Sequence, residues 1–269
     1  MKMKKILITG GSGFLGSKLV EKLKDKYNII IFNKSNNKDI TKKEDFVGLE
    51  ADYVIHLAAL TRSQNNEDMF NINVNGTLNV LEFCKEKKAK FVFASSAAVY
   101  GDYKEAIKED FLLKPKSFYG LTKVLGEKMC EFYNKNFNIP IVVLRIFNMY
   151  GPEQQKGFLI PDIVSQLKNE KIIIGNPYPK RDYVYVNDVV EAFVKGIELE
   201  GFNIINIGTG KSHSGKEVVE MLAKDKEIEF LDSIKIDSNS CADISKAREL
   251  LNWKPKVFLE EGLRRVLGS

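Results

Sequence analysis

The sequence predicts an α/β fold in which a doubly wound parallel sheet is covered by helices on both faces. Strand-like apolar runs alternate with helix-like stretches from the first residues. These strand-like runs are apolar almost throughout, which is typical of strands buried on both faces between two helical layers. The chain has 269 residues, enough for one large domain or two smaller ones.

The expected elements follow one another in order. In the first helix, Leu15, Leu19, Val20 and Leu23 recur at helical spacing. The expected strands and helices of the first half are "KILIT" (strand), "FLGSKLVEKLKDK" (helix), "NIIIF" (strand), "DYVIHLAA" (strand), "VNGTLNVLEFCKEK" (helix), "KFVFASS" (strand), "YGLTKVLGEKMCEFYNKN" (helix) and "PIVVLRIF" (strand). The rhythm loosens after "NMYGP". We therefore expect a larger domain at 1–150 and a smaller region at 151–269, with a strand near 203–207 returning to the sheet.

Composition favours a soluble cytoplasmic protein. Hydrophobic residues make up 44% of the chain and charged residues 29%, and no apolar stretch approaches the roughly 18 residues of a membrane span. Three scattered cysteines predict buried free thiols in a reducing compartment, and His56 and His213 are too isolated to predict a metal site. The net charge of +5 comes from lysines scattered among acids, which indicates a solvated surface rather than a nucleic-acid patch.

The stretch "ILITGGSGFLG" places three glycines between the first strand and the first helix. Glycine there permits a tight turn, close approach of the backbone to a pyrophosphate, and close packing of helix on strand. The N-terminus of the helix then offers free N–H groups to the phosphates. This Rossmann-type arrangement predicts a dinucleotide site formed by Gly10, Gly13, Phe14, Leu15 and Gly16.

The second strand ends at Asn33, where a residue that contacts the adenosine ribose is expected. An acid at this position accepts from the ribose hydroxyls and repels a 2′-phosphate. Asn33 carries no such charge, and Lys34 would attract a phosphate. The choice between NAD and NADP therefore stays open at this point.

The stretch "SFYGLTK" places Tyr119 and Lys123 on one face of a helix, because they are four residues apart. A phenol has an ordinary pKa of about 10, and a nearby ammonium group favours its ionised form. Tyr100 and Lys104 have the same spacing, but they lie in "VYGDYK", which reads as a turn. Tyr119 and Lys123 are therefore the candidate catalytic pair.

The order of motifs resembles a known family. The glycine motif, "HLAA", "NVNGT", "SSAAVYG", "YGLTK", "RIFNMYGP", "RDYVYVNDVVEA", "NIGTG" and "ADISKARELLNWKP" are similar to those of the extended short-chain dehydrogenases/reductases. Within them, the chain resembles the NAD-dependent epimerases and dehydratases that act on nucleotide sugars. The resemblance extends over nearly the whole chain.

The resemblance implies roles for individual residues. Ser96 would be the catalytic hydroxyl, with Ser95 as its structural neighbour. Tyr119 would be the acid/base on the sugar hydroxyl, and Lys123 would tune it and hold the nicotinamide ribose. Asn73 resembles an asparagine that supports the catalytic helix. His56, in "VIHLAA", reads as a packed residue beside the cofactor.

Further contacts are implied around these residues. Leu57, Ala58 and Ala59 of "HLAA" would line the cofactor. Asn148 and Arg181 resemble contacts to the sugar and its pyrophosphate. Three of the implied roles have a simpler structural interpretation. Ser96 could cap a strand, Asn148 could be a turn residue, and Arg181 could form a surface ion pair. Compared with members of this family, the chain has fewer residues between Gly210 and Ala242. It also lacks an arginine that often gives them a second pyrophosphate contact, and Lys211 or Lys235 would have to replace that arginine.

The implied reaction is confined to C4 of the sugar. Dehydrating relatives carry Asp-Glu directly after the catalytic hydroxyl, whereas this chain has Ala97 and Ala98, which exchange no proton. The expected activity is that of a nucleotide-sugar 4-epimerase with NAD. The alternatives are an NADPH-dependent reductase of a 4-keto sugar and an inactive nucleotide sensor, and the intact Ser96, Tyr119 and Lys123 argue against the sensor.

A homodimer is also implied. Relatives usually pair through two helices, which here match "NVLEFCKEK" and "FYGLTKVLGEKMCEFY". Leu121, Val124, Leu125 and Phe132 would supply an apolar stripe, although such a stripe is equally compatible with intramolecular packing. The sequence names neither the sugar nor the nucleotide.

Overall fold

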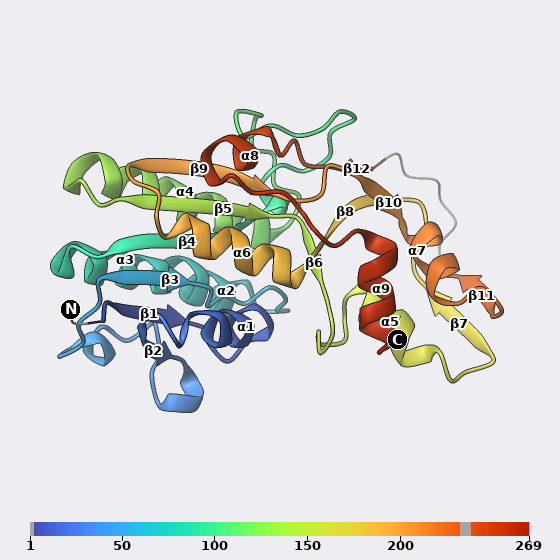
Figure 1. The fold of residues 1–269 in the computed structure, drawn as a ribbon, viewed down its shortest axis with the longest axis horizontal. Coiled ribbons are helices and arrows are strands. Elements are labelled where there is room, and N and C mark those ends of the chain that lie inside the picture. Colours follow the sequence, from blue (N-terminus) through green and yellow to red (C-terminus); the bar gives the residue numbers. More distant parts are fainter. Residues whose placement is uncertain (1–2, 232–237, 269) are drawn as a thin grey trace.

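A six-stranded sheet runs through the larger lobe of the molecule (Figure 1). The computed structural model describes residues 3–231 and 238–268. Every neighbouring pair of strands in this sheet is parallel. In spatial order the strands are β2 (Asn28–Phe32), β1 (Lys5–Thr9), β3 (Tyr53–His56), β4 (Lys90–Ser96), β5 (Ile141–Ile146) and β9 (Phe202–Ile207). The order reverses between β1 and β3, and open α/β sheets bind ligands at the carboxyl edge beside such a switch point.

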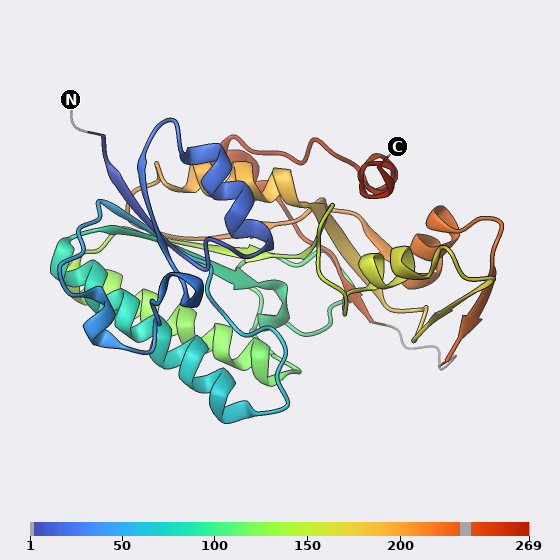
Figure 2. The ribbon, with the colours of Figure 1, turned by 90° about the horizontal axis from the view of Figure 1, so that it is seen from below.

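Helices cover both faces of the sheet (Figure 2). One layer consists of α1 (Phe14–Leu23), α6 (Val186–Gly196) and α8 (Ser245–Leu251). The other consists of α3 (Gly76–Lys87) and α4 (Phe118–Phe137). A short helix, α2 (Asn66–Phe70), and a turn of π-helix at Asn71–Asn75 lead into α3 without a break. The helix expected from residue 74 is therefore preceded by helical structure that the sequence did not predict.

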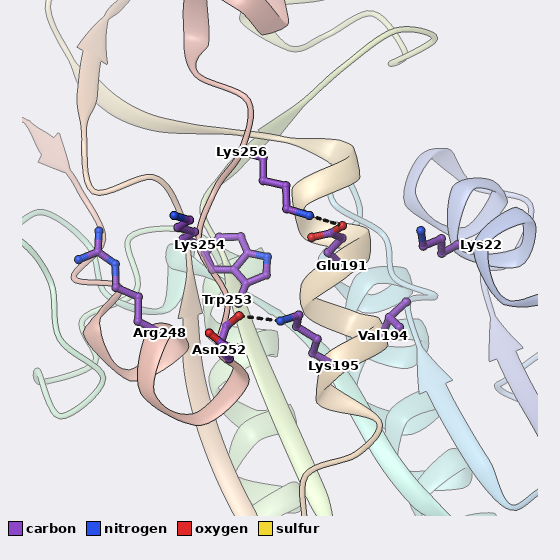
Figure 3. A pocket seen from close by; sticks show the side chains of 9 residues that line it. All are labelled: Lys22, Glu191, Val194, Lys195, Arg248, Asn252, Trp253, Lys254 and Lys256. Atoms are coloured by element: carbon purple, nitrogen blue, oxygen red, sulfur yellow. Dashed lines mark hydrogen bonds and ion pairs between the residues drawn. The ribbon is translucent and has the colours of Figure 1, made fainter.

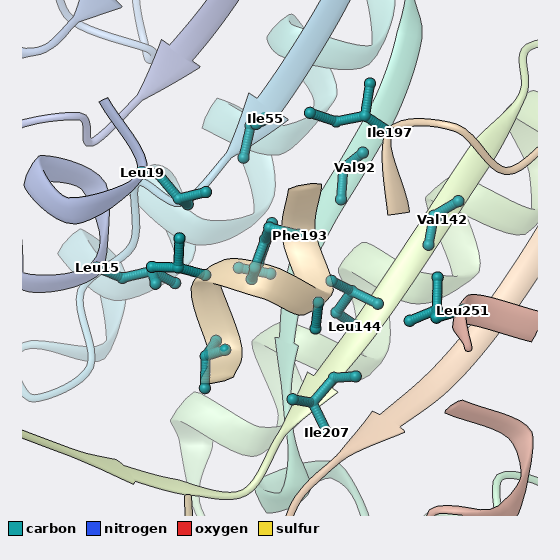
Figure 4. Close-up of a cluster of buried hydrophobic side chains, with 14 of the residues drawn as sticks. Leu15, Leu19, Ile55, Val92, Val142, Leu144, Phe193, Ile197, Ile207 and Leu251 are labelled. Carbon is teal, nitrogen blue, oxygen red and sulfur yellow. The ribbon is translucent and has the colours of Figure 1, made fainter. Parts of the chain in front are cut away.

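The apolar residues of α1 and α6 pack on the first face of the sheet (Figure 4). Phe193 of α6 is fully buried among side chains of α1 and of the central strands. Leu15, Leu19 and Leu23 of α1 are buried as their spacing predicts, whereas Val20 is partly exposed. Complete burial of each such side chain contributes roughly 1.5–3 kcal/mol, so this interface fixes where the first turn of α1 lies.

The second half of the chain returns to this sheet. Strand β9 pairs in parallel with β5, with Arg145 opposite Asn206. This pairing confirms the strand expected near 203–207. Tyr100 follows a single 3-10 turn, Ala97–Val99, so no helix aligns it with Lys104, as expected. The three cysteines are free and buried, also as expected.

A smaller lobe lies beyond the carboxyl edge of the sheet (Figure 1). Its core includes Tyr150, Tyr185 and Ile163. Its elements are β6 (Asn148–Tyr150), α5 (Leu159–Gln166), β7 (Lys171–Ile174), β8 (Lys180–Tyr185), β10 (Ser212–Ser214), α7 (Gly215–Leu222), β11 (Glu227–Phe230), β12 (Asn239–Ser240) and α9 (Leu259–Leu267). Strands β6, β8, β10 and β12 form one sheet, and β7 pairs with β11. Within the described ranges, no helix is both long and apolar enough to cross a bilayer.

Candidate active site

The turn after β1 forms a cradle that only glycine allows. Gly10 has φ +71°, and a Cβ on it would lie 2.9 Å from the backbone nitrogen of Ala58 in the loop after β3. A Cβ on Gly16 would lie 2.2 Å from the carbonyl oxygen of Gly10. Gly13 begins α1 and caps none of its N–H groups with a side chain. The first turn of α1, which starts with Phe14 and Leu15, therefore keeps backbone donors for phosphate oxygens, so the cradle fits a dinucleotide.

The loop that follows β3 is held from both sides. Leu57 and Ala58 each donate a backbone N–H to the Thr9 hydroxyl, at 3.2 Å. Leu60 donates its N–H to Asn73 Oδ1 at 2.7 Å, and its carbonyl accepts from Asn73 Nδ2 at 2.9 Å. The sequence-predicted cofactor residues Leu57–Ala59 thus lie beside the glycine turn, at the switch point between β1 and β3.

Asn73 links this loop to α4. Its Nδ2 also donates to the Thr122 hydroxyl, at 3.0 Å, and its own carbonyl accepts from Thr77 Oγ1 at 2.6 Å. Asn73 lies in the turn of π-helix, a feature often found at functional sites. Asn73 thus joins the loop after β3 to α4.

His56 is packed inside the protein. Its ring contacts Thr9 Oγ1 through Nδ1 at 2.6 Å and Thr77 Oγ1 through Nε2 at 2.9 Å. Burial, and secondarily the charge of Lys123, lowers the pKa of His56 to about 3. The ring is therefore neutral at physiological pH and orders two threonines.

Ser96 and Tyr119 come together although they belong to different elements. Ser96 ends β4, and its Oγ accepts from the backbone N–H of Ala98 at 3.2 Å. Tyr119 lies in the first turn of α4, and its phenol lies near enough to Ser96 for the serine hydroxyl to act on its pKa. A Cβ on Gly120 would lie 2.4 Å from the carbonyl oxygen of Ala98, so glycine allows α4 to begin directly against the turn after Ser96.

Lys123 lies one helical turn beyond Tyr119. Its side chain is buried, donates to the carbonyl of Ala94 at 2.8 Å, and places Nζ 5.7 Å from the centre of the Tyr119 ring. Burial lowers the pKa of Lys123 to about 8, against the opposing charges of Cys130 and Glu127. Burial raises the pKa of Tyr119 to about 12, while the nearby Ser96 hydroxyl acts in the opposite direction. This arrangement suits general acid–base chemistry on a substrate hydroxyl.

Asn33 lies at the end of β2, close to the glycine turn. Its Nδ2 donates to Ser12 Oγ at 2.8 Å, and its Oδ1 accepts from the backbone of Asn36 at 3.0 Å. Lys34 lies 3.5 Å from the Asp39 carboxylate, and its side chain is 73% exposed. The charge of Lys34 therefore already has a carboxylate partner, which weakens the argument for a 2′-phosphate.

Asn148 and Arg181 lie in the smaller lobe. Asn148 begins β6, is exposed, and pairs with Tyr183 of β8. Arg181 Nη1 donates to Ser238 Oγ at 2.9 Å, and Ser238 Oγ donates to Asp102 Oδ1 at 2.7 Å. Among the described residues, Arg181 thus contacts a serine and forms no direct ion pair of the kind that the simpler interpretation expects.

Of the two lysines considered as replacements for the missing arginine, the structure describes Lys211 only. Lys211 Nζ lies 5.7 Å from the centre of the Phe258 ring. Lys235 lies outside the described residues.

Two buried charged residues beside the catalytic pair, Glu127 and Arg145, were not singled out from the sequence. Glu127 and Arg145 form an ion pair with both side chains only 3% exposed, and Ser95 donates to Glu127. A charged residue inside the apolar run "VVLRIF" was the available signal for Arg145. Glu127 offered a weaker signal, because helix carboxylates are usually solvated.

A hollow of about 410 Å³ lies away from these residues, between α1, α6, α8 and the segment after α8 (Figure 3). Most of the side chains that line it are basic, and they include Lys22, Lys195 and Arg248 in the last turns of their helices. Positive charge is favoured at helix C-termini, and the same dipoles disfavour a bound anion. Lys195 also donates to the carbonyls of Leu251 and Asn252, at 3.0 and 2.6 Å. We therefore assign no ligand to this hollow.

Comparisons with known proteins agree with the geometry. The model of the NAD-dependent epimerase/dehydratase family matches residues 6–208. The chain is 36% identical to a putative UDP-glucose 4-epimerase of Methanocaldococcus jannaschii, covering 98% of this chain and 97% of that one. It is 33% identical to a dTDP-4-dehydro-6-deoxyglucose reductase of Escherichia coli, covering 98% and 96%. The solved structure of Thermus thermophilus UDP-glucose 4-epimerase in complex with NAD superposes with a TM-score of 0.88 at 27% identity, covering 98% of both chains.

Proposed function

The chain belongs to the NAD-dependent epimerase/dehydratase family, and from that premise we propose that it is a nucleotide-sugar 4-epimerase of the UDP-glucose 4-epimerase kind. The observation that carries the proposal is that Ser96 and Tyr119 lie close together, with buried Lys123 one turn away and Ala97 and Ala98 directly after the serine. This set of groups serves oxidation and reduction at one carbon and offers no side-chain acid or base for removing water.

Each catalytic candidate has a defined task in this proposal. Tyr119 takes the proton of the sugar 4-hydroxyl and later returns it, and Ser96 holds the same oxygen by a hydrogen bond. The Lys123 ammonium favours the ionised phenol. NAD, held by the residues assigned below, would supply hydride transfer from C4 and its return to the opposite face of that carbon. The protein must therefore let the sugar present either face to the same pair of hydroxyl groups.

We assign the cofactor to the switch point of the sheet. Gly10, Gly13 and Gly16 with the first turn of α1 would hold the pyrophosphate, and Asn33 would contact the adenosine ribose. Residues 57–59 and Asn73 would line the remainder of the cofactor. NAD is favoured over NADP by the family and by the Asp39 partner of Lys34.

The remaining assignments concern the substrate and the assembly. We assign residues 1–150 to dinucleotide binding, with β9 completing the sheet, and residues 151–269 to a smaller substrate-binding region in which Asn148 and Arg181 contact the sugar and its pyrophosphate. We also propose a cytoplasmic homodimer. Leu121 and Phe132 of α4 support it, because these apolar side chains expose 41% and 57% of their surface.

A reductase of a nucleotide-linked 4-keto-6-deoxy sugar is the alternative. The observation in its favour is Asn33, which places no negative charge where a 2′-phosphate of NADP would lie. The similarity to the E. coli reductase also supports this alternative. Such an enzyme would use the same Ser96, Tyr119 and Lys123 in one direction only.

The product of the reaction distinguishes these functions. We expect UDP-glucose or UDP-galactose, incubated with the purified protein, to give a product of unchanged mass with C4 inverted. A product lighter by one water would contradict the assignment of Ala97 and Ala98. Consumption of NADPH in step with a 4-keto sugar, without epimerisation of either hexose, would favour the reductase.

A further inference from the structure

A buried polar network lies directly beneath the catalytic pair, and nothing in the proposed chemistry uses it. Its centre is the Glu127 carboxylate, one helical turn beyond Lys123 on α4. Glu127 Oε1 accepts from Ser95 Oγ at 2.5 Å and from Arg145 Nε at 2.9 Å. Glu127 Oε2 accepts from Arg145 Nη2 at 2.6 Å. The carboxylate therefore joins α4 to two neighbouring strands.

Arg145 extends the network to the far side of the site. Its Nη1 donates to the hydroxyl of Tyr100 at 2.6 Å and to the carbonyl of Glu109 at 2.9 Å. The Tyr100 hydroxyl donates in turn to Asn206 Oδ1, at 2.7 Å. Tyr100 follows the turn that contains Ala97 and Ala98. The network therefore holds the segment around Ser96 on both sides, through Ser95 before it and Tyr100 after it.

Stability alone is a weak reason for this arrangement. Moving two charges out of water is costly, and well-packed apolar residues often replace a buried ion pair without loss of stability. What apolar packing lacks is direction, whereas several short hydrogen bonds to one carboxylate fix both angle and distance. Ser95 is adjacent to Ser96, and Glu127 is on the helix that carries Tyr119, so the network spans the two elements that must meet.

We propose that Glu127, held by Arg145 and linked to Ser95, is a positioning residue that fixes the carboxyl end of β4 against α4 and so sets the Ser96–Tyr119 distance. Ser95 is the connecting residue, because its hydroxyl is the hydrogen bond from β4 itself to this carboxylate. The inference rests on the proposed function only in that it needs turnover at Ser96 and Tyr119 to be measured.

The first test removes the connecting hydrogen bond and nothing else of the network. Ser95→Ala should lower kcat about tenfold and leave KM and bound cofactor within about twofold, because the reacting groups shift while the binding surfaces stay. The matched control is Tyr133→Phe, which removes a hydroxyl-to-carboxylate hydrogen bond from the same helix to Glu82 of α3. Both variants should lose similar thermal stability, and the control should keep the wild-type kcat.

A second variant tests the Glu127 carboxylate through the pH profile of kcat, which a purely structural role of Glu127 would not change. Lys123 is faced by His56 from β3 and by Tyr119, Glu127 and Cys130 from its own helix. Glu127 is one of the two groups that raise the pKa of Lys123. Glu127→Gln should therefore lower kcat and move the basic limb of its pH profile to lower pH.

The outcomes separate the inference from the proposed function. A wild-type protein that converts no nucleotide sugar would refute the function and the premise of the inference together. An active wild type whose Ser95→Ala variant retains kcat, or loses no more than the Tyr133→Phe control, would overturn the positioning role alone. Because Ser95→Ala leaves the ion pair intact, it decides the question even where Glu127→Gln does not fold.

Discussion

The Ser96 hydroxyl and the Tyr119 phenol lie close together, although Ser96 ends a strand and Tyr119 lies in the first turn of a helix. The close approach of Gly120 to Ala98 makes this contact possible. The two hydroxyl groups thereby lie side by side, as the proposed binding of one substrate oxygen requires.

Tyr119→Phe removes the acid/base group and keeps the ring. Turnover should fall by about 10²–10⁴-fold, the usual contribution of general acid–base catalysis, while folding and cofactor content stay nearly unchanged. Ser96→Ala should have a smaller effect, since one hydrogen bond to the sugar oxygen is lost. Steady-state kinetics with circular dichroism and nucleotide content would check both, and turnover within about threefold of wild type would exclude Tyr119 from this role.

Lys123 predicts how the rate depends on pH. Its pKa is lowered to about 8, so the ammonium is present below that pH and is lost as the pH rises through it. If the ammonium is needed to ionise Tyr119, kcat should fall about tenfold per pH unit above about 8. A kcat that stays level up to about pH 9.5 would show that the charge of Lys123 is not required.

His56 predicts a dependence of stability on pH. Its pKa is about 3 in the folded protein against an ordinary 6.5, so between these values the unfolded chain binds a proton that the folded chain does not. The free energy of unfolding should therefore decrease as pH falls below about 6.5, by at most about 1.4 kcal/mol per unit from this residue.

Urea unfolding of His56→Gln at several pH values would measure that contribution. The variant should show a shallower loss of stability in acid than the wild type. His213→Gln is the matched control, because His213 is partly exposed, and it should keep the wild-type slope. Equal slopes for all three proteins would place the acid sensitivity elsewhere.

Asn33→Asp should shift cofactor preference toward NAD. The new carboxylate keeps the acceptor for the Asn36 backbone and can accept from the Ser12 hydroxyl, while it repels a 2′-phosphate. Asp39→Asn should shift the ratio the other way, because it frees the charge of Lys34. Dissociation constants for both cofactors test this pair, and a wild type that already prefers NADP would move the reductase to first place.

Gly16→Ala should destabilise the protein, because the new Cβ would lie 2.2 Å from a backbone oxygen. Overpacking of this kind typically costs about 1–3 kcal/mol, and the cofactor cradle would have to shift to accommodate it. Gly175→Ala is the matched control, since a Cβ there meets nothing within 4 Å. Thermal melts with and without NAD compare the two, and equal melting temperatures would contradict the close packing at Gly16.

Local pattern was enough to predict most of the large lobe. Apolar runs and helical spacing predicted β1 to β5 and α1, α3 and α4, because in each the buried residues recur with the period of the element. The π-helical turn at Asn71–Asn75 was not predicted, since its polar residues show no such period. The chain Arg181–Ser238–Asp102 joins residues distant in sequence, and only the fold brings them together.

Some residues of the candidate site could likewise be predicted from the sequence, and others could not. Gly10, Ser96, Tyr119 and Lys123 stand in ordered motifs at strand ends and helix starts, where sequence carries the most information. The pairing of Lys34 with Asp39 was not evident, because it depends on the path of the connector between them. Glu127 was missed for a different reason, since a carboxylate on a helix gives no sign in sequence that its face is buried.

Strand β9 has a consequence for how the protein is made. The sheet gains its last strand only when residues 202–207 have left the ribosome, long after the glycine cradle and the catalytic serine. Until then β5 is an open edge of Ile141, Val142, Val143 and Leu144, a template for pairing with another chain. Fragments that stop short of β9 should therefore aggregate rather than bind nucleotide.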